Sequence, residues 1–166
     1  SSYSASMVQP ITAAPSAKQG AFKPNGGFGG KRPSVSLEGA FSINYYFTPS
    51  SGVKGEMRLY YWTEETFNKV STLTSINASG ILPMEKTADG SYTAAITGIA
   101  AKDIDGAIYV AGVYTSTNGT VYSTGVLHYS LGAFCTSQVT SGTAEIQPMA
   151  AAIAVYGYYA KKHFSA

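Results

Sequence analysis

Aromatic side chains are the residues of this chain whose type and spacing best suit them to bind a ligand. The sequence contains 13 Tyr and one Trp. If alternate strand positions face a core, Tyr46, Tyr60 and Trp62 fall on the opposite face, and Tyr109 and Tyr122 fall on the outer face of a hairpin. Such rings could stack on sugars, because aromatic faces offer broad apolar area at low entropy cost. They could instead support a second packed layer or a neighbouring subunit, since alternation does not show which outer faces meet water.

Acidic residues do not form a pattern that predicts catalysis. Glu64 and Glu65 are adjacent acids at an expected helix start, where acids usually stabilise the first turn. Asp103 and Asp105 lie beside Gly106, in an expected turn. The chain has no G-x-S-x-G elbow, P-loop or H-E-x-x-H motif. The sequence therefore predicts a protein that is not an enzyme, with no catalytic residues and no cofactor.

Histidine and cysteine do not predict a metal site. The two His are far apart in sequence, and neither belongs to a carboxylate cluster. His128 is expected to pack against a tyrosine, and His163 lies near the end of an expected helix. Cys135 is the only cysteine, so it cannot form an internal disulfide and is expected to fill a small buried site.

Charge and hydropathy narrow the classes of partner. Eleven Lys and Arg against nine Asp and Glu leave a net charge of +2, and the basic residues are scattered, so we expect no nucleic-acid partner. No apolar run approaches the ~18 residues of a membrane span. Charged residues make up only 12% of a chain rich in Ser, Thr, Gly and Tyr, which favours an extracellular surface or a packed assembly. Because the chain starts at Ser1, we expect a processed protein or a fragment.

Period-two alternation predicts most of the remaining elements. Residues 35–47 read as one long half-buried strand, and residues 56–62 and 91–97 as further strands. Thr63 followed by two acids predicts the start of a short helix, with Phe67 on its apolar face.

A hairpin is predicted around Asn118 and Gly119, because both residues tolerate the positive φ of a type I′ turn. A two-residue loop there places Val110 opposite Leu127 and Ile108 opposite Tyr129, with these pairs facing the core. Tyr109 and His128 would then face each other on the outer side.

The first 33 residues differ in composition from residues 34–166, which we expect to form the folded domain. Ser, Ala, Pro and Gly dominate this segment, with a glycine-rich run at residues 26–30. One interpretation is a flexible linker. The other is an assembly arm that lies over a neighbour and inserts occasional apolar anchors. The candidate anchors are Met7, Val8, Ile11, Phe22 and Phe28.

Residues 149–164 predict an amphipathic helix that closes the domain. Ile153, Tyr156, Ala160 and Phe164 recur at intervals of three and four. With the strands, this helix indicates a mainly β fold: an antiparallel β-sandwich with a short internal helix and a C-terminal helix.

Four segments together resemble a module that recurs in large surface proteins of gut Clostridia and their phages. They are SLEGAFSINYYF at residues 36–47, GIAAKD at 98–103, YSTGVLHYS at 122–130 and VYGYYAKKHF at 155–164. In that family an opening strand, a G-I-A-A-K-D/N turn and a closing helix similar to NYGAAAQxYF occur in this order. The resemblance covers residues 33–164 and leaves the N-terminal segment outside it.

The resemblance implies an Ig-like, non-catalytic module that accompanies other domains. This chain has Tyr158 and Tyr159 where the family has small residues, and these side chains would suit subunit contacts if they face outward. We therefore expect a structural or interaction module of a bacterial surface or phage virion. Its partners would be other copies or other domains of the assembly. The alternative is a carbohydrate-binding module with glycans as partners. If the arm mediates assembly, deleting residues 1–33 should abolish assembly without unfolding the domain.

Overall fold

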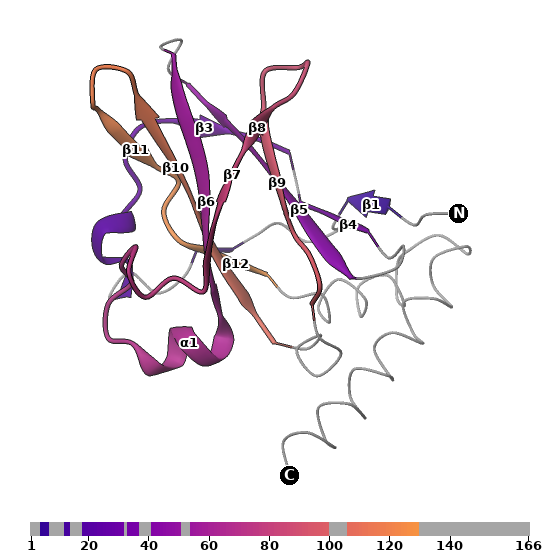
Figure 1. The fold of residues 1–166 in the computed structure, drawn as a ribbon, viewed down its shortest axis with the longest axis vertical. Coiled ribbons are helices and arrows are strands. Elements are labelled where there is room, and N and C mark those ends of the chain that lie inside the picture. Colours follow the sequence, from indigo (N-terminus) through magenta and orange to yellow (C-terminus); the bar gives the residue numbers. More distant parts are fainter. Residues whose placement is uncertain are drawn as a thin grey trace.

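The alternating segments form strands, and the strands pair into two antiparallel sheets (Figure 1). The structure is a computed structural model that describes residues 18–31, 33–36, 41–50, 54–99 and 106–129, and the backbone of residues 4–6 and 12–13. Strands dominate these residues and helices are short. The expectation of a mainly β protein is therefore confirmed.

The first sheet has the strand order β1-β4-β5-β9-β8, and β3 also pairs with β5. Its central strand β5 is flanked along one side by two short strands, β3 and β4. The bounds are β1 Ser4–Ser6, β3 Phe28–Gly29, β4 Ser34–Ser36, β5 Ser42–Pro49, β8 Glu85–Lys86 and β9 Tyr92–Ile96.

The second sheet has the order β2-β12-β10-β6-β7, and β11 also pairs with β10. Its two longest strands, β6 and β10, pair over nine residues each. The bounds are β2 Thr12–Ala13, β6 Gly55–Thr63, β7 Gly80–Pro83, β10 Ile108–Ser116, β11 Val121–Ser123 and β12 Leu127–Tyr129.

The main core lies between the sheets. Alternate residues of each sheet point into it, as the period-two pattern predicted. Trp62 and its neighbours form a second cluster, apart from this core. The buried members of the main core are Val35, Ile43, Tyr45, Phe47, Met57, Leu59, Met84, Ile96, Ile108, Val110 and Tyr114.

Residues 35–47 do not form one strand. They contribute to β4 and β5, which run antiparallel with Val35 opposite Ile43. Both residues have odd numbers and both are buried, so the odd positions stay on the core side when the chain reverses. The alternation therefore continues through the reversal, and periodicity could not reveal it.

The hairpin exists, but its loop has three residues. Gly119 has a φ of +89°, but no described non-glycine residue has a positive φ. A type I′ turn needs a positive φ at both central residues, so the prediction of this turn at Asn118 and Gly119 is wrong. The Gly119 N–H donates to the Ser116 carbonyl at 2.9 Å. A positive-φ glycine at the third position is typical of three-residue hairpin loops.

The longer loop shifts the nearby pairing by one residue, and a bulge then restores it. Tyr122 lies opposite Tyr114, whereas a two-residue loop would have placed it opposite Thr115. At residues 124–126 the chain bulges at Gly125, whose φ is +80°. Beyond the bulge the predicted pairs are confirmed: 108 with 129, 109 with 128 and 110 with 127.

The short helix α1, Glu64–Lys69, begins directly after Thr63, as predicted. The Thr63 hydroxyl accepts a hydrogen bond from the Thr66 N–H at 3.3 Å and caps the helix. Phe67 is buried, as predicted. No helix among the described residues is long and apolar enough to cross a membrane.

The described part of the N-terminal segment folds onto the domain. β1 pairs with β4, β2 with β12 and β3 with β5, so residues before Pro33 contribute to both sheets. The boundary predicted at residue 33 is therefore not a boundary in the structure. The predicted helix at 149–164, with Tyr158 and Tyr159, lies outside the described residues, as do Cys135, His163, Asp103 and Asp105.

Candidate functional site

The predicted aromatic face is not an exposed platform. Trp62 is fully buried, and its indole N–H donates to the Asn77 side-chain oxygen at 3.0 Å. It does lie on the side of β6 opposite the main core, but residues of the same chain cover it. The interpretation of Trp62 as an exposed sugar-stacking residue is therefore wrong. The outer face of this sheet supports a second packed layer.

Phe22 is one of the side chains that cover this face. It lies in a short 3-10 helix, Gly20–Phe22, and its ring centroid is 5.0 Å from that of Trp62 and 5.1 Å from that of Tyr60. The Ser123 hydroxyl also donates to the Phe22 carbonyl, at 3.2 Å. Phe22, predicted as an anchor for a neighbour, is thus buried within its own domain.

Tyr109 and Tyr122 lie on different surfaces. Tyr109 stacks on Phe67 of α1, with a centroid distance of 3.6 Å and an interplanar angle of 2°, and Lys18 lies over the same Phe67 ring. As predicted, Tyr109 also contacts His128. Tyr122 instead packs against the main core, because the one-residue shift in the hairpin turned it to the opposite side.

A break in the edge of the first sheet creates a cavity. β3 pairs with residues 48–49 of β5 and β4 with residues 42–44, which leaves residues 45–47 opposite the break. The chain stays close there: a Cβ on Gly30 would lie 2.5 Å from the Tyr46 carbonyl oxygen, so only glycine fits.

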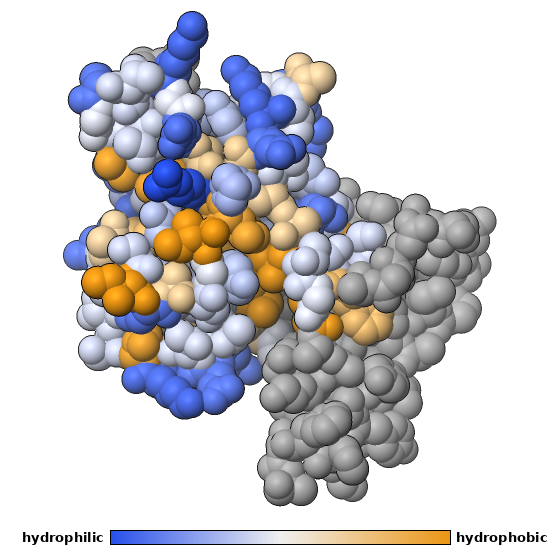
Figure 2. Space-filling view, viewed as in Figure 1, coloured by the Kyte–Doolittle hydropathy of each residue, from blue (hydrophilic) through white to orange (hydrophobic). Residues whose placement is uncertain are grey.

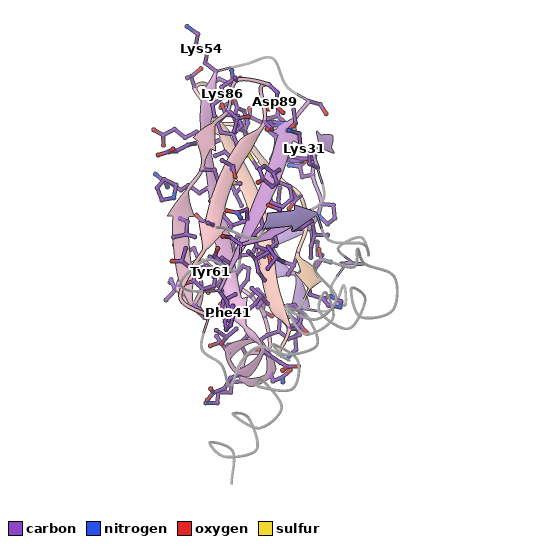
Figure 3. All side chains as sticks on the ribbon, turned by 90° about the vertical axis from the view of Figure 1, so that its right-hand side faces the viewer. Lys31, Phe41, Lys54, Tyr61, Lys86 and Asp89 are labelled. Carbon is purple, nitrogen blue, oxygen red and sulfur yellow. The ribbon has the colours of Figure 1, made fainter. Side chains whose placement is uncertain are left out.

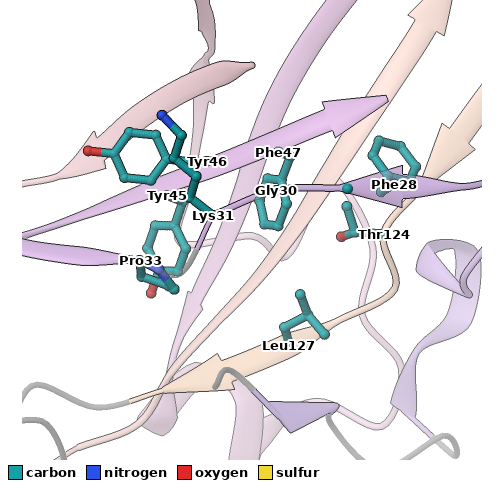
Figure 4. A pocket seen from close by; sticks show the side chains of 10 residues that line it. Phe28, Gly30, Lys31, Pro33, Tyr45, Tyr46, Phe47, Thr124 and Leu127 are labelled. Carbon is teal, nitrogen blue, oxygen red and sulfur yellow. The ribbon is translucent and has the colours of Figure 1, made fainter. Parts of the chain in front are cut away.

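The cavity has a volume of about 310 Å³ and opens at this break (Figure 4). Its floor is buried, and its rim includes the exposed residues 29–31. Figure 4 shows the rings of Tyr45 and Phe47 pointing to the side of β5 on which Leu127 lies. The described lining residues are Phe28, Gly29, Gly30, Lys31, Pro33, Tyr45, Tyr46, Phe47, Thr124 and Leu127.

Tyr45 lines this cavity, but its hydroxyl is buried and is not open to it. Its side chain is fully buried, and its hydroxyl has no hydrogen-bond partner in the described part of the chain. Burial raises the pKa of this hydroxyl well above its ordinary value, so it stays protonated. A buried hydroxyl without a partner costs about 1–3 kcal/mol.

An ion pair holds the rim segment against the β8–β9 turn. The Lys31 ammonium lies 2.5 Å from an Asp89 carboxylate oxygen, and it also lies 5.9 Å from the centre of the Tyr46 ring. Figure 3 shows Lys31 and Asp89 at the end of the molecule that carries Lys54 and Lys86. Asp89 also accepts hydrogen bonds from the hydroxyls of Thr87 and Ser91.

We expect acid to loosen this rim. Lys31 first, and then the Ser91 and Thr87 groups, hold the pKa of Asp89 well below its ordinary value. A lowered folded pKa contributes stability above the unfolded pKa of about 4, and this contribution is lost as the pH falls below it. The protection factors of the amides of residues 28–31, which correct for the intrinsic pH dependence of exchange, should therefore fall in the wild type as the pH drops below about 4.

The matched variant for this prediction is Asp89→Asn, which removes the charge and keeps the size. In this variant, the protection factors of residues 28–31 should be lower than in the wild type near neutral pH and should change little with acid. Because both partners are exposed, global stability should change little. Parallel pH profiles of exchange in the two proteins would contradict the role of Asp89.

Sequence reasoning identified only part of this cavity. Phe28 and Tyr46 were candidate contact residues, in different predicted sites, and the structure brings both to the cavity. Alternation along residues 35–47 predicts Tyr45 and Phe47 as core residues, and no sequence pattern points to Lys31 or Thr124. The signal that could have found it is the glycine run at 26–30, which lets the edge strand leave the sheet. Met7, Val8 and Ile11 lie outside the described residues.

The surface in Figure 2 is polar at both ends, including the end that carries α1, and more apolar in the middle. Polar side chains gather at the end that carries the β8–β9 turn, and apolar ones gather across the middle of the face formed by β7 and β9. The large hydrophobic side chains exposed among the described residues are Ile76, Ile81 and Val121. They belong to a loop, β7 and β11, and exposed apolar side chains of this kind are normal on a globular surface.

Comparison with known proteins adds no assignment. No family model matches the chain, and no significant match is found among curated proteins or solved structures. Within the described residues, no group of three or more His, Cys, Asp and Glu side chains could hold a metal ion.

Proposed function

We propose that this domain is a non-catalytic interaction module, an Ig-like β-sandwich that assembles by exchanging its N-terminal strands with a neighbouring copy. The observation that carries the proposal is the position of β1 and β2. β1 is the edge strand beside β4 in one sheet, and β2 is the edge strand beside β12 in the other. One short stretch of chain therefore adds a strand to each sheet.

Strand addition suits exchange because backbone hydrogen bonds supply the affinity and need no particular side chains. β1 pairs through three residues and β2 through two, so each contact alone is weak. In one molecule, the arm closes on its own sheets. At high local concentration the same pairs form with a neighbour, as in other strand-swapped assemblies.

The setting that we propose is an extracellular or virion assembly on a bacterial surface or phage. Its support is the resemblance of four segments to the surface module and a charged fraction of only 12%. The aromatic platform of the carbohydrate-binding alternative loses its support, because Trp62 is buried and Tyr122 faces the main core.

The test is a double proline substitution in β1, Ala5→Pro with Ser6→Pro. Consecutive N–H groups of a strand point to opposite edges, so one of these two must face β4. Proline removes both donors and should prevent pairing, whether in the same chain or in a neighbour. At high protein concentration, light scattering should show oligomers for the wild type and monomers for this variant.

The matched control is Ala5→Ser with Ser6→Ala, which keeps both N–H groups and should assemble like the wild type. The thermal unfolding of all three proteins should be similar, because β1 contributes only three paired residues. A wild type that is monomeric at every concentration would contradict the proposal. Oligomers of the proline variant equal to those of the wild type would contradict it as well.

A further inference from the structure

The chain contains two Asn-Gly pairs, Asn25-Gly26 and Asn118-Gly119. Such a pair can react with itself. The backbone nitrogen of the glycine attacks the side-chain carbon of the asparagine, and this approach is open because glycine carries no side chain. Both pairs are exposed in the structure, so exposure does not distinguish them. The hydrogen bonds of the two asparagine side chains do distinguish them.

Two donors polarise the side-chain carbonyl of Asn118, at the tip of the β10–β11 hairpin (Figure 1). Its oxygen accepts from the Thr120 N–H at 3.0 Å and from the Ser116 hydroxyl. Because a backbone N–H can only donate, the accepting atom is the oxygen and not the amide nitrogen. This oxygen becomes negative when a nucleophile adds to the carbon beside it, so the two donors are placed like those of an oxyanion hole.

Gly119 supplies the nucleophile, and the space around it is open. A Cβ on Gly119 would have no described atom within 4 Å. Its N–H donates to the Ser116 carbonyl at 2.9 Å, and this hydrogen bond must open before the nitrogen can react. One such bond contributes only about 0.5–1.5 kcal/mol. An exposed loop tip therefore opens often, without unfolding of the domain.

Asn25 shows the opposite arrangement. Its side-chain nitrogen, which would be the leaving group, donates to the Val121 carbonyl at 2.9 Å. Its backbone N–H and C=O both pair with Ser123, at 2.9 and 3.2 Å. A Cβ on Gly26 would lie 2.6 Å from the ring of Tyr122, so this glycine lies against a side chain of the domain. We therefore expect the fold to protect Asn25.

We propose that Asn118 is a self-modification site, at which the folded domain converts this asparagine to aspartate and isoaspartate. The Gly119 nitrogen forms a bond to the Asn118 side-chain carbon. The bond from that carbon to the amide nitrogen breaks, and the proton of the Gly119 N–H passes through water to this nitrogen, which leaves as ammonia. One water molecule then opens the resulting succinimide ring at either carbonyl. Each product carries a carboxylate, so the formal net charge falls from +2 to +1.

The test follows both Asn-Gly pairs in the full chain during incubation at mildly alkaline pH. Peptide mass spectrometry separates the two pairs, because conversion adds one mass unit to the peptide that contains the altered residue. In the folded protein, Asn118 should convert faster than Asn25 by about tenfold or more. In urea the two rates should become similar, since both pairs then have the same neighbour and no fixed hydrogen bonds.

Ser116→Ala tests the donors, because it removes one hydrogen bond to the Asn118 oxygen and should slow conversion of Asn118 by about tenfold. Thr117→Ala is the matched control, since it changes a hydroxyl residue of the same loop and leaves both donors in place. Far-UV circular dichroism checks that both variants are folded. Two results would overturn the proposal: Asn118 converts no faster than Asn25 in the folded wild type, or Ser116→Ala converts as fast as the wild type. Neither result depends on strand exchange, so this proposal can fail separately from the proposed function.

Discussion

Trp62→Ala should destabilise the protein by about 3–5 kcal/mol, which is the usual cost of removing a large buried aromatic side chain. Trp62 is fully buried in the second cluster, where Phe22 packs edge-on against it. Its indole N–H also donates to Asn77, whose side-chain oxygen accepts a second hydrogen bond from the Thr74 N–H. Urea denaturation measures the change in the free energy of unfolding. It should be followed by far-UV circular dichroism, because this signal does not depend on the tryptophan that the substitution removes.

Trp62→Phe separates packing from hydrogen bonding in this prediction. Phenylalanine keeps an aromatic ring but cannot donate to Asn77, so we expect a smaller loss than for alanine. The Asn77 oxygen would still accept from Thr74, which limits the penalty. If Trp62→Ala were as stable as the wild type, Trp62 would have to be exposed. It would then again be a candidate sugar-binding residue.

The alternation of odd and even residues between the two faces of a strand explains which parts of the fold could be predicted. The core residues of β5 and β6 followed from alternation, because a strand must keep one face on the core. Alternation could not show the reversal between β4 and β5, since Val35 and Ile43 have the same parity. It also misplaced Tyr122, because one extra loop residue turned β11 over and the bulge at Gly125 turned the chain back.

The second layer was harder to predict because its parts are distant in sequence. The contact between Phe22 and Trp62 joins the N-terminal segment to β6, and neither local pattern specifies the other. The composition of residues 1–33 indicated a segment that could not fold by itself. That reasoning is correct for the isolated segment and incomplete for the chain, because a large outer aromatic face was available to cover.

Two truncations should therefore behave very differently. Deleting residues 1–33 removes Phe22 and exposes Trp62 and Tyr60, so we expect a loss of at least about 3–5 kcal/mol. Small domains have only about 5–15 kcal/mol in total, so this variant should be largely unfolded or prone to aggregate. The buried position of Phe22 therefore argues against the expectation that the domain stays folded without residues 1–33.

Deleting residues 1–17 should cost far less, because it keeps Lys18, Phe22 and the β3 strand. Among the described residues of this segment, the loss is five paired backbone positions, three in β1 and two in β2. Each hydrogen bond contributes about 0.5–1.5 kcal/mol, and ordering each of these residues on folding costs about 1–2 kcal/mol of backbone entropy. The deletion removes both contributions, so the two effects nearly cancel. Denaturant midpoints of both truncations provide the measurement, with Phe22→Ala in the full chain as the control.

Phe22→Ala should reproduce most of the effect of the longer truncation if the second layer is the cause. An equal stability of the two truncations would contradict the role of Phe22. If only the shorter truncation is folded, it also becomes the correct protein for testing assembly, because it lacks both exchanging strands but keeps the covered aromatic face. Loss of oligomers in that variant would then report on the strands alone, whereas loss in the longer one would report on unfolding.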